Sequence, residues 1–184
     1  MSRLPDPDPQ TIPANVEDFL TQFPPDAMFK MLTHSVSTVQ PFIGLAQAIY
    51  TSLQLPIRTR EVVILTVADA VECDFVFTQH IPISEAAGVD QDLRRLIRRR
   101  DHANPTMSEP DRTIVQFATE VVTQPRVSDA TFAAARALLT AREVVELLHV
   151  CGYYWTFSRI CTTLDVDLTQ LYAELPQTGW STTP

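Results

Sequence analysis

The chain has few cysteines, and they do not form a disulfide framework. Only Cys73, Cys151 and Cys161 occur among the 184 residues, an odd number without regular spacing. Such usage is typical of reduced thiols in a reducing compartment. Because none of them lies at zinc-ligand spacing from a histidine or another cysteine, the sequence predicts no metal site.

Long apolar runs are also missing. A bilayer-spanning helix needs a run of about eighteen apolar residues, and the chain has none. The N-terminus, MSRLPDPDPQ, has no apolar stretch that could serve as a signal peptide. We therefore expect a cytoplasmic protein without a membrane partner.

Basic residues are outnumbered by acidic ones. The chain has 14 Lys and Arg against 22 Asp and Glu, a net charge of −8 and a pI near 4.9. Because nucleic acid and anionic membrane surfaces would repel such a chain, we expect a small-molecule substrate and no nucleic-acid partner. The arginines that gather at 94–100 could bind an anion or a partner, but a solvated helix face that helps oligomer contacts is the simpler interpretation.

Alternation of apolar and polar residues with period two, the mark of half-buried strands, is absent. The chain is 45% apolar, which suffices for a sizeable core. The sequence predicts an all-α protein, a single domain of about eight helices. The segments with helical patterns are 14–23, 27–32, 41–53, 61–70, 74–87, 91–100, 111–122, 129–139, 141–163 and a last short one at 168–174.

The N-terminus differs in composition from the rest. Residues 1–13 carry four prolines and alternating aspartates, which cannot bury apolar surface. We predict a flexible arm over 1–13, a helical domain over 14–175 and a C-terminal tail over 176–184.

The stretch with most chemical information runs from Arg60 to Val89. Glu61 begins a segment that is apolar almost all round, as in a buried helix, and the helix dipole favours a carboxylate in its first turn. Cys73 and His80 are seven residues apart, so both should project from one face of the next helix. Pro82 removes a backbone donor nearby and predicts a kink or a restart of that helix.

Glu61, Cys73 and His80 are the candidate catalytic residues. A thiol at a helix start and near an imidazolium should have a lowered pKa, and the carboxylate could orient or charge the imidazole. The structural alternatives are a buried cysteine that acts as a small hydrophobic residue and a histidine that only forms hydrogen bonds.

The spacing of these three residues resembles the signature of the carboxymuconolactone decarboxylase and alkylhydroperoxidase D-like proteins. That signature is a Glu, eleven residues, a Cys, two residues, a second Cys, three residues and a His, and here the similar sequence SEAAGVD follows it. The resemblance covers about residues 40–170. It implies an alkylhydroperoxidase D-like fold and assembly as a homo-oligomer, a trimer or a hexamer.

Val76 occupies the position of the second cysteine. In the peroxidase branch of the family, two cysteines cycle between dithiol and disulfide, and one thiol cannot close that cycle alone. The decarboxylase branch needs no cysteine pair, so Val76 favours that branch or an unassigned third one. A disulfide needs Cα atoms within about 7 Å, which chance placement of Cys151 or Cys161 rarely supplies, so we expect peroxide to form no internal disulfide at Cys73.

Three functions remain open. The first is a decarboxylase-like lyase without cofactor, in which His80 moves a proton on a small organic acid or lactone, Glu61 sets its charge and Cys73 shapes the pocket. The second is a thiol peroxidase that uses Cys73 and borrows its resolving thiol from a partner. The third is a non-catalytic binding protein with a relic site.

An internal similarity indicates a duplicated helical unit. Residues 138–167 are similar to 55–90, with Arg142-Glu143 opposite Arg60-Glu61. The second copy would keep the packing and lose the chemistry. We therefore expect its aromatic residues, Tyr153, Tyr154 and Trp155, to be core or interface residues and its His149 to be structural.

Overall fold

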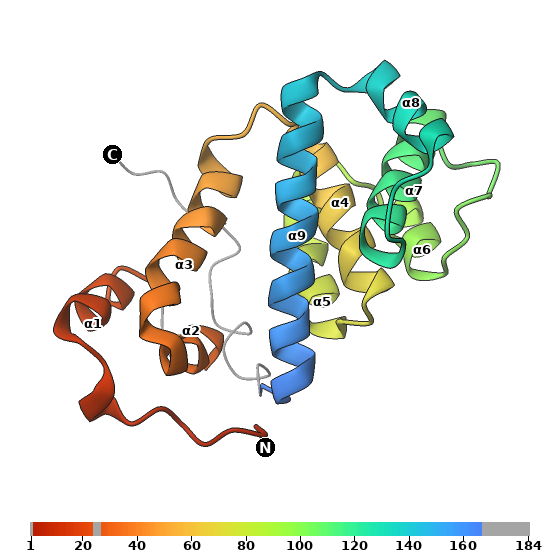
Figure 1. Cartoon of the computed structure of the whole chain (residues 1–184). Coiled ribbons are helices and arrows are strands. Elements are labelled where there is room, and N and C mark those ends of the chain that lie inside the picture. Colours follow the sequence, from red (N-terminus) through yellow and green to blue (C-terminus); the bar gives the residue numbers. More distant parts are fainter. Residues whose placement is uncertain (1, 24–26, 167–184) are drawn as a thin grey trace.

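The computed structural model of the protein describes residues 2–23 and 27–166, and all regular structure within them is helical (Figure 1). The all-α prediction is thereby confirmed. The α-helices of this part of the chain are α1 (Ala14–Leu20), α2 (Ala27–Leu32), α3 (Val36–Thr51), α4 (Ile57–Ala70), α5 (Asp74–Ala86), α6 (Gln91–Arg98), α7 (Glu109–Thr123), α8 (Asp129–Leu138) and α9 (Ala141–Leu164), and two 3-10 helices cover Pro9–Thr11 and Thr33–Ser35. The helix predicted at 168–174 and the tail at 176–184 lie outside the described residues. None of the described helices is both long and apolar enough to cross a membrane.

Most predicted helix ends agree with the observed ones within three residues, and three further differences lie around prolines. Helix α3 begins at Val36 and contains Pro41, which was predicted as its first residue. Helix α4 begins directly after Pro56, four residues before the predicted start. Helix α5 continues through Pro82, so it does not restart there, and the alternative of a kink stays a prediction. A proline inside a helix removes only its own backbone hydrogen bond, and packing holds the rest of the helix together.

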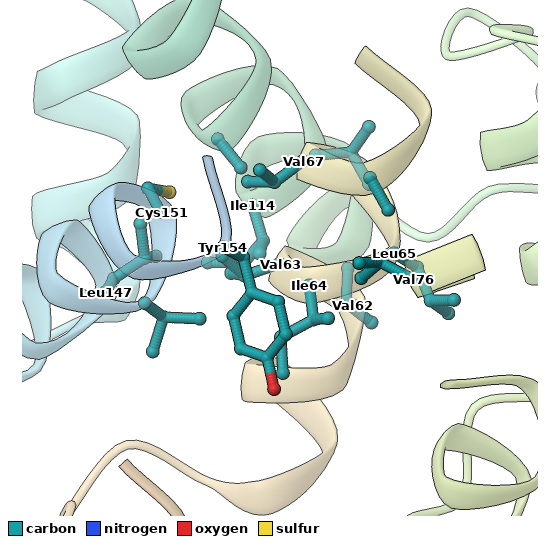
Figure 2. Packing of buried hydrophobic residues seen from close by; sticks show 14 of the residues in the cluster. Val62, Val63, Ile64, Leu65, Val67, Val76, Ile114, Leu147, Cys151 and Tyr154 are labelled. Carbon is teal, nitrogen blue, oxygen red and sulfur yellow. The ribbon is translucent and has the colours of Figure 1, made fainter. Parts of the chain in front are cut away.

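Helix α4 is the centre of the fold. It packs against α5, α6, α7 and α9, and every residue from Arg60 to Asp69 is buried. Figure 2 shows its valine, isoleucine and leucine side chains against Ile114 of α7 and Leu147 of α9. Each such fully buried side chain contributes about 1.5–3 kcal/mol. A polar side chain on α4 is therefore held in a dry and rigid environment.

A tight turn connects α4 to α5. Glu72 adopts a left-handed conformation with a φ of 59°, and the Cys73 N–H donates to the Ala68 carbonyl at 2.8 Å. This is the hydrogen-bond pattern that ends many helices, and Cys73 then starts α5 as its N-cap residue. The turn reverses the chain, so the beginning of α4 lies opposite the middle of α5.

Arginines of the 94–100 cluster hold this turn in place. Arg98 pairs with Asp69 and Asp74, and Arg100 donates to Asp69 at 2.9 Å. Arg94 is buried and donates to the Val89 carbonyl. The interpretation as a solvated face is therefore wrong for the buried Arg94, whereas Arg98 and Arg100 stay exposed and pair with acidic residues distant in the sequence.

The N-terminal arm contacts two distant helices. The Arg3 N–H donates to the Leu164 carbonyl at the end of α9 at 2.8 Å, and Lys30 of α2 pairs with Asp6 at 2.5 Å. These contacts lie at the surface, where one ion pair contributes about 1 kcal/mol or less. The flexibility of the arm stays a prediction.

Candidate active site

The structure brings Glu61 and His80 together in the interior. Glu61 lies in the second turn of α4 and is 0% exposed, and His80 lies in the second turn of α5 and is 5% exposed. The Glu61 Oε2 atom is 2.8 Å from the His80 Nδ1 atom. The α4–α5 turn creates this contact between residues 19 positions apart.

Arg60 completes an ion-pair network with Glu61. The guanidinium of Arg60 contacts the other carboxylate oxygen, Oε1, through Nε at 3.0 Å and Nη2 at 2.9 Å. Burial opposes ionisation of Glu61, but the hydrogen bond and charge of His80 and the charge of Arg60 outweigh it, so the pKa of Glu61 is lowered. Glu61 is thus an ionised acceptor, which places a proton on His80 Nδ1 and directs Nε2 to the opposite side.

Two tyrosines lie on that opposite side. The Tyr50 hydroxyl of α3 is 3.5 Å from His80 Nε2, at the limit of hydrogen bonding, and 2.5 Å from the Tyr154 hydroxyl of α9. The Arg60 guanidinium stacks 4.4 Å from the centre of the Tyr50 ring. Burial raises the pKa of both tyrosines, so both are neutral proton donors. Figure 2 shows the Tyr154 ring against the α4 core, with its hydroxyl at the edge of the cluster.

We call Arg60, Glu61, His80, Tyr50 and Tyr154 the acid–base cluster. It holds a carboxylate, an imidazole and two phenols within one set of hydrogen bonds. Such a set can accept a proton at the imidazole, stabilise the imidazolium with the carboxylate and donate hydrogen bonds from the phenols.

Cys73 is separate from this cluster. Two helical turns amount to about 10 Å along the α5 axis, so a shared face does not bring Cys73 to His80. The pKa of Cys73 is lowered to about 6, first by a hydrogen bond from the Cys161 thiol, against the effect of burial, and then by the Val76 N–H and the Ser158 hydroxyl. The expectation that an imidazolium lowers this pKa is therefore wrong, whereas the expectation that peroxide forms no internal disulfide at Cys73 stays a prediction.

Tyr50 and Tyr154 were missed by the sequence analysis. Tyr50 lies 30 residues before His80 on another helix, and no spacing rule connects the two. Tyr154 is buried as predicted, but its hydroxyl belongs to the acid–base cluster rather than to the core. One signal was available: a buried tyrosine hydroxyl needs a polar partner.

In the part of the second repeat copy that the structure describes, residues 138–166, no equivalent cluster occurs. Glu143 forms a capping box with Thr140 at the start of α9, and Arg142 pairs with Glu146 at 2.7 Å. Glu146 in turn accepts from the backbone N–H groups of Gln54 and Leu55. These residues stabilise a helix start and a loop, and α9 is one continuous helix without the turn that joins α4 and α5.

Within residues 2–23 and 27–166, no three His, Cys, Asp or Glu side chains are grouped so that they could hold a metal ion. A cavity of about 90 Å³ lies beside Asp69, Arg100 and His102, and no residue of the acid–base cluster lines it. This cavity is therefore separate from the acid–base cluster.

Comparisons with known proteins identify the fold. No family model matches the chain, and neither does any curated protein sequence. An uncharacterized peroxidase-related protein from Ralstonia eutropha JMP134 with the alkylhydroperoxidase AhpD core has a TM-score of 0.76 and 16% identity, over 96% of this chain and 97% of that one. A peroxidase-related protein from Silicibacter sp. TM1040 has a TM-score of 0.73 and 16% identity, over 94% and 93%. The debrominase Bmp8, solved with 2,3,4-tribromopyrrole, has a TM-score of 0.69 and 14% identity, over 94% and 96%. The chain has the alkylhydroperoxidase D-like fold, as the resemblance implied.

Proposed function

We propose that the protein is a cofactor-independent acid–base enzyme, of the decarboxylase-like kind, that acts on a small organic acid or lactone. The observation that carries this proposal is the buried Glu61–His80 contact of 2.8 Å, with Arg60 on the other carboxylate oxygen. A histidine held in this way has one fixed tautomer and one fixed orientation, which is what a proton-transfer catalyst needs.

In the proposed mechanism, the Nε2 atom of His80 exchanges a proton with the substrate. Glu61 stabilises the imidazolium that forms, and Tyr50 and Tyr154 donate hydrogen bonds to a developing enolate oxygen. The substrate's own carbonyl group stabilises the carbanion, so no cofactor is required. General acid–base catalysis of this kind contributes a rate factor of about 10²–10⁴.

The alternatives are less well supported. None of the contacts of Cys73 described above involves His80, so a peroxidase in which the imidazole activates a single Cys73 thiol lacks the required pairing. A relic site would keep a buried Arg60–Glu61–His80 network that costs desolvation energy and gives little net stability. The peroxidase-related names and the debromination belong to the structural relatives.

The test is turnover of a panel of β-keto acids and carboxylated lactones, followed by carbon dioxide release and by deuterium uptake from heavy water. We expect His80→Gln to lose activity by about 100-fold or more and to keep its fold. His149→Gln is the matched control, because His149 is exposed on α9, outside the acid–base cluster. Wild-type turnover in His80→Gln on the substrate that the panel identifies would remove His80 from the mechanism.

A further inference from the structure

The acid–base cluster is closed to solvent in the structure. Glu61 is 0% exposed, and His80 and Tyr154 are each 5% exposed. The proposed mechanism uses the His80 Nε2 atom, and the Tyr50 hydroxyl oxygen lies 3.5 Å from it. A reacting substrate atom needs about 3–3.5 Å on each side, so it does not fit between these two atoms. One neighbour of Nε2 therefore has to move before a substrate can bind.

Tyr50 is the member of the cluster that lies nearest to solvent. It is partly exposed, whereas the other four members are buried. It belongs to the last turn of α3, which ends at Thr51, and helix ends are among the least stable parts of a fold. Tyr154, by contrast, lies inside α9, and its ring packs 5.1 Å from that of His80 and 5.3 Å from that of Tyr153. The movement is therefore one of Tyr50.

The backbone around Tyr50 is held on both sides. The Glu146 carboxylate of α9 accepts from the N–H groups of Gln54 and Leu55 at 2.9 Å and 2.7 Å. The Arg60 guanidinium lies 3.5 Å from the Tyr50 carbonyl oxygen. Because these contacts fix the end of α3 and the loop that follows it, the change that uncovers Nε2 is a rotation of the Tyr50 side chain rather than a displacement of the helix.

We propose that Tyr50 is the gate of the acid–base cluster. Its side chain rotates away from the His80 Nε2 atom to admit the substrate and then returns over it. The hydrogen bond between the Tyr50 and Tyr154 hydroxyls, at 2.5 Å, is the latch of this gate. In the open state the Tyr50 hydroxyl no longer bonds to Tyr154, and it becomes a donor for the substrate oxygen when the gate closes.

This inference rests on the proposed function, since it is the substrate of that reaction that needs the opening. It also narrows the substrate class. Because only one side chain moves and the backbone stays in place, the opening has the size of a tyrosine ring. The gate therefore favours small acids and lactones that are no larger than a single ring.

The contacts of the closed gate set the fraction of molecules in which it is open. A neutral hydrogen bond such as the latch contributes a factor of about 5. The Arg60 guanidinium, which stacks 4.4 Å from the centre of the Tyr50 ring, contributes another factor of about 5. Together they give a factor of about 25, so about 4% of the molecules are open at equilibrium.

The experiment measures how fast diethyl pyrocarbonate modifies each histidine of the full chain near neutral pH, with peptide mapping of the products. His149 is exposed and gives the rate of an accessible imidazole. In the wild type, His80 should react about 25-fold more slowly than His149, since the reagent reaches it only through the open gate. Low concentrations of urea should leave the His80 rate nearly unchanged, because rotation of one side chain exposes little surface.

Variants of the gate should change the His80 rate in a fixed order. Tyr50→Phe keeps the ring and removes the latch, so the rate should rise by about 5-fold. Tyr50→Ala removes the gate itself, and His80 should then react nearly as fast as His149. Tyr153→Phe is the matched control and should keep the wild-type rate. The rate of His102, which lines the cavity outside the cluster, should stay the same in every variant that keeps its fold.

Three results would overturn the proposal. A wild-type His80 that reacted as fast as His149 would mean that the site is already open. An unchanged His80 rate in Tyr50→Phe, which keeps the packing of the ring, would mean that the latch does not hold the gate. Modification of His80 only where circular dichroism shows unfolding would assign its exposure to unfolding. None of these measurements uses turnover, so the gate can fail while the acid–base enzyme stands, and a failed substrate panel leaves the labelling rates intact.

Discussion

Replacing Glu61 with glutamine removes one charge from the most buried part of the acid–base cluster and keeps the shape of the side chain. The two oxygens of Glu61 accept from Arg60 at 2.9 Å and from His80 at 2.8 Å. Because an amide has only one oxygen, one of these donors would face the glutamine NH₂ group. Arg60, which is 6% exposed, would also lose its counter-charge.

The expected cost of Glu61→Gln is about 3 kcal/mol of unfolding free energy. This is the lower end of the range for breaking a buried ion pair, about 3–5 kcal/mol, because the amide oxygen still accepts one hydrogen bond. For a chain of this size, about 2–4 °C of melting temperature corresponds to each kcal/mol, so we expect Tm to fall by about 6–12 °C. Urea unfolding, followed by far-UV circular dichroism near neutral pH, measures the difference.

Glu143→Gln is the matched control. Glu143 aligns with Glu61 in the internal repeat, but it is partly exposed and only accepts from the Thr140 N–H at 2.7 Å. A glutamine oxygen can accept the same hydrogen bond in a capping box, so this change should cost less than about 1 kcal/mol. Equal stability of the two variants would refute the assignment of Glu61 as the centre of a buried ion-pair network.

The pH dependence gives a second check on Glu61. Its pKa is lowered in the folded protein, so the stability it contributes is complete above the unfolded-state pKa of about 4.3 and is lost as the pH falls through the lower folded-state value. The difference between wild type and Glu61→Gln should therefore shrink in acid. A difference that stayed constant below about pH 4 would mean that the carboxylate charge is not the source of the effect.

Three more contacts lead to measurable outcomes. Tyr154→Phe removes the hydroxyl that lies 2.5 Å from that of Tyr50 and should lower turnover by about 10-fold. Tyr153→Phe is the control and should not lower turnover, because the Tyr153 ring packs on neighbouring rings. Equal kcat values for the two variants would contradict this prediction. The rate of Cys73 alkylation should rise with pH around a midpoint near 6, and Cys161→Ala should move that midpoint upward. An unmoved midpoint would show that the Cys161 thiol does not stabilise the Cys73 thiolate. Light scattering should give the mass of a trimer or a hexamer, since exposed apolar side chains remain on the described surface; a monomer at micromolar concentration would contradict this.

Local patterns in the sequence were sufficient for the helices and for the Glu61–His80 pair. The helices after Ser128 and Thr140 begin where they were predicted, and the helix before Gly88 ends within one residue of its predicted end, because helix ends depend on neighbours a few positions away. The pairing of Glu61 with His80 depends only on two helices and the short turn between them.

Only the tertiary structure decided which other residues join each site. Tyr50 and Tyr154 come from α3 and α9, and Cys161 comes from the far end of α9, with no spacing rule to connect them to α4 or α5. Their positions result from the packing of α9 against the buried helix α4 and of α3 against α9. Such contacts depend on side-chain volumes over the whole core, and therefore they could be identified only after the chain was folded.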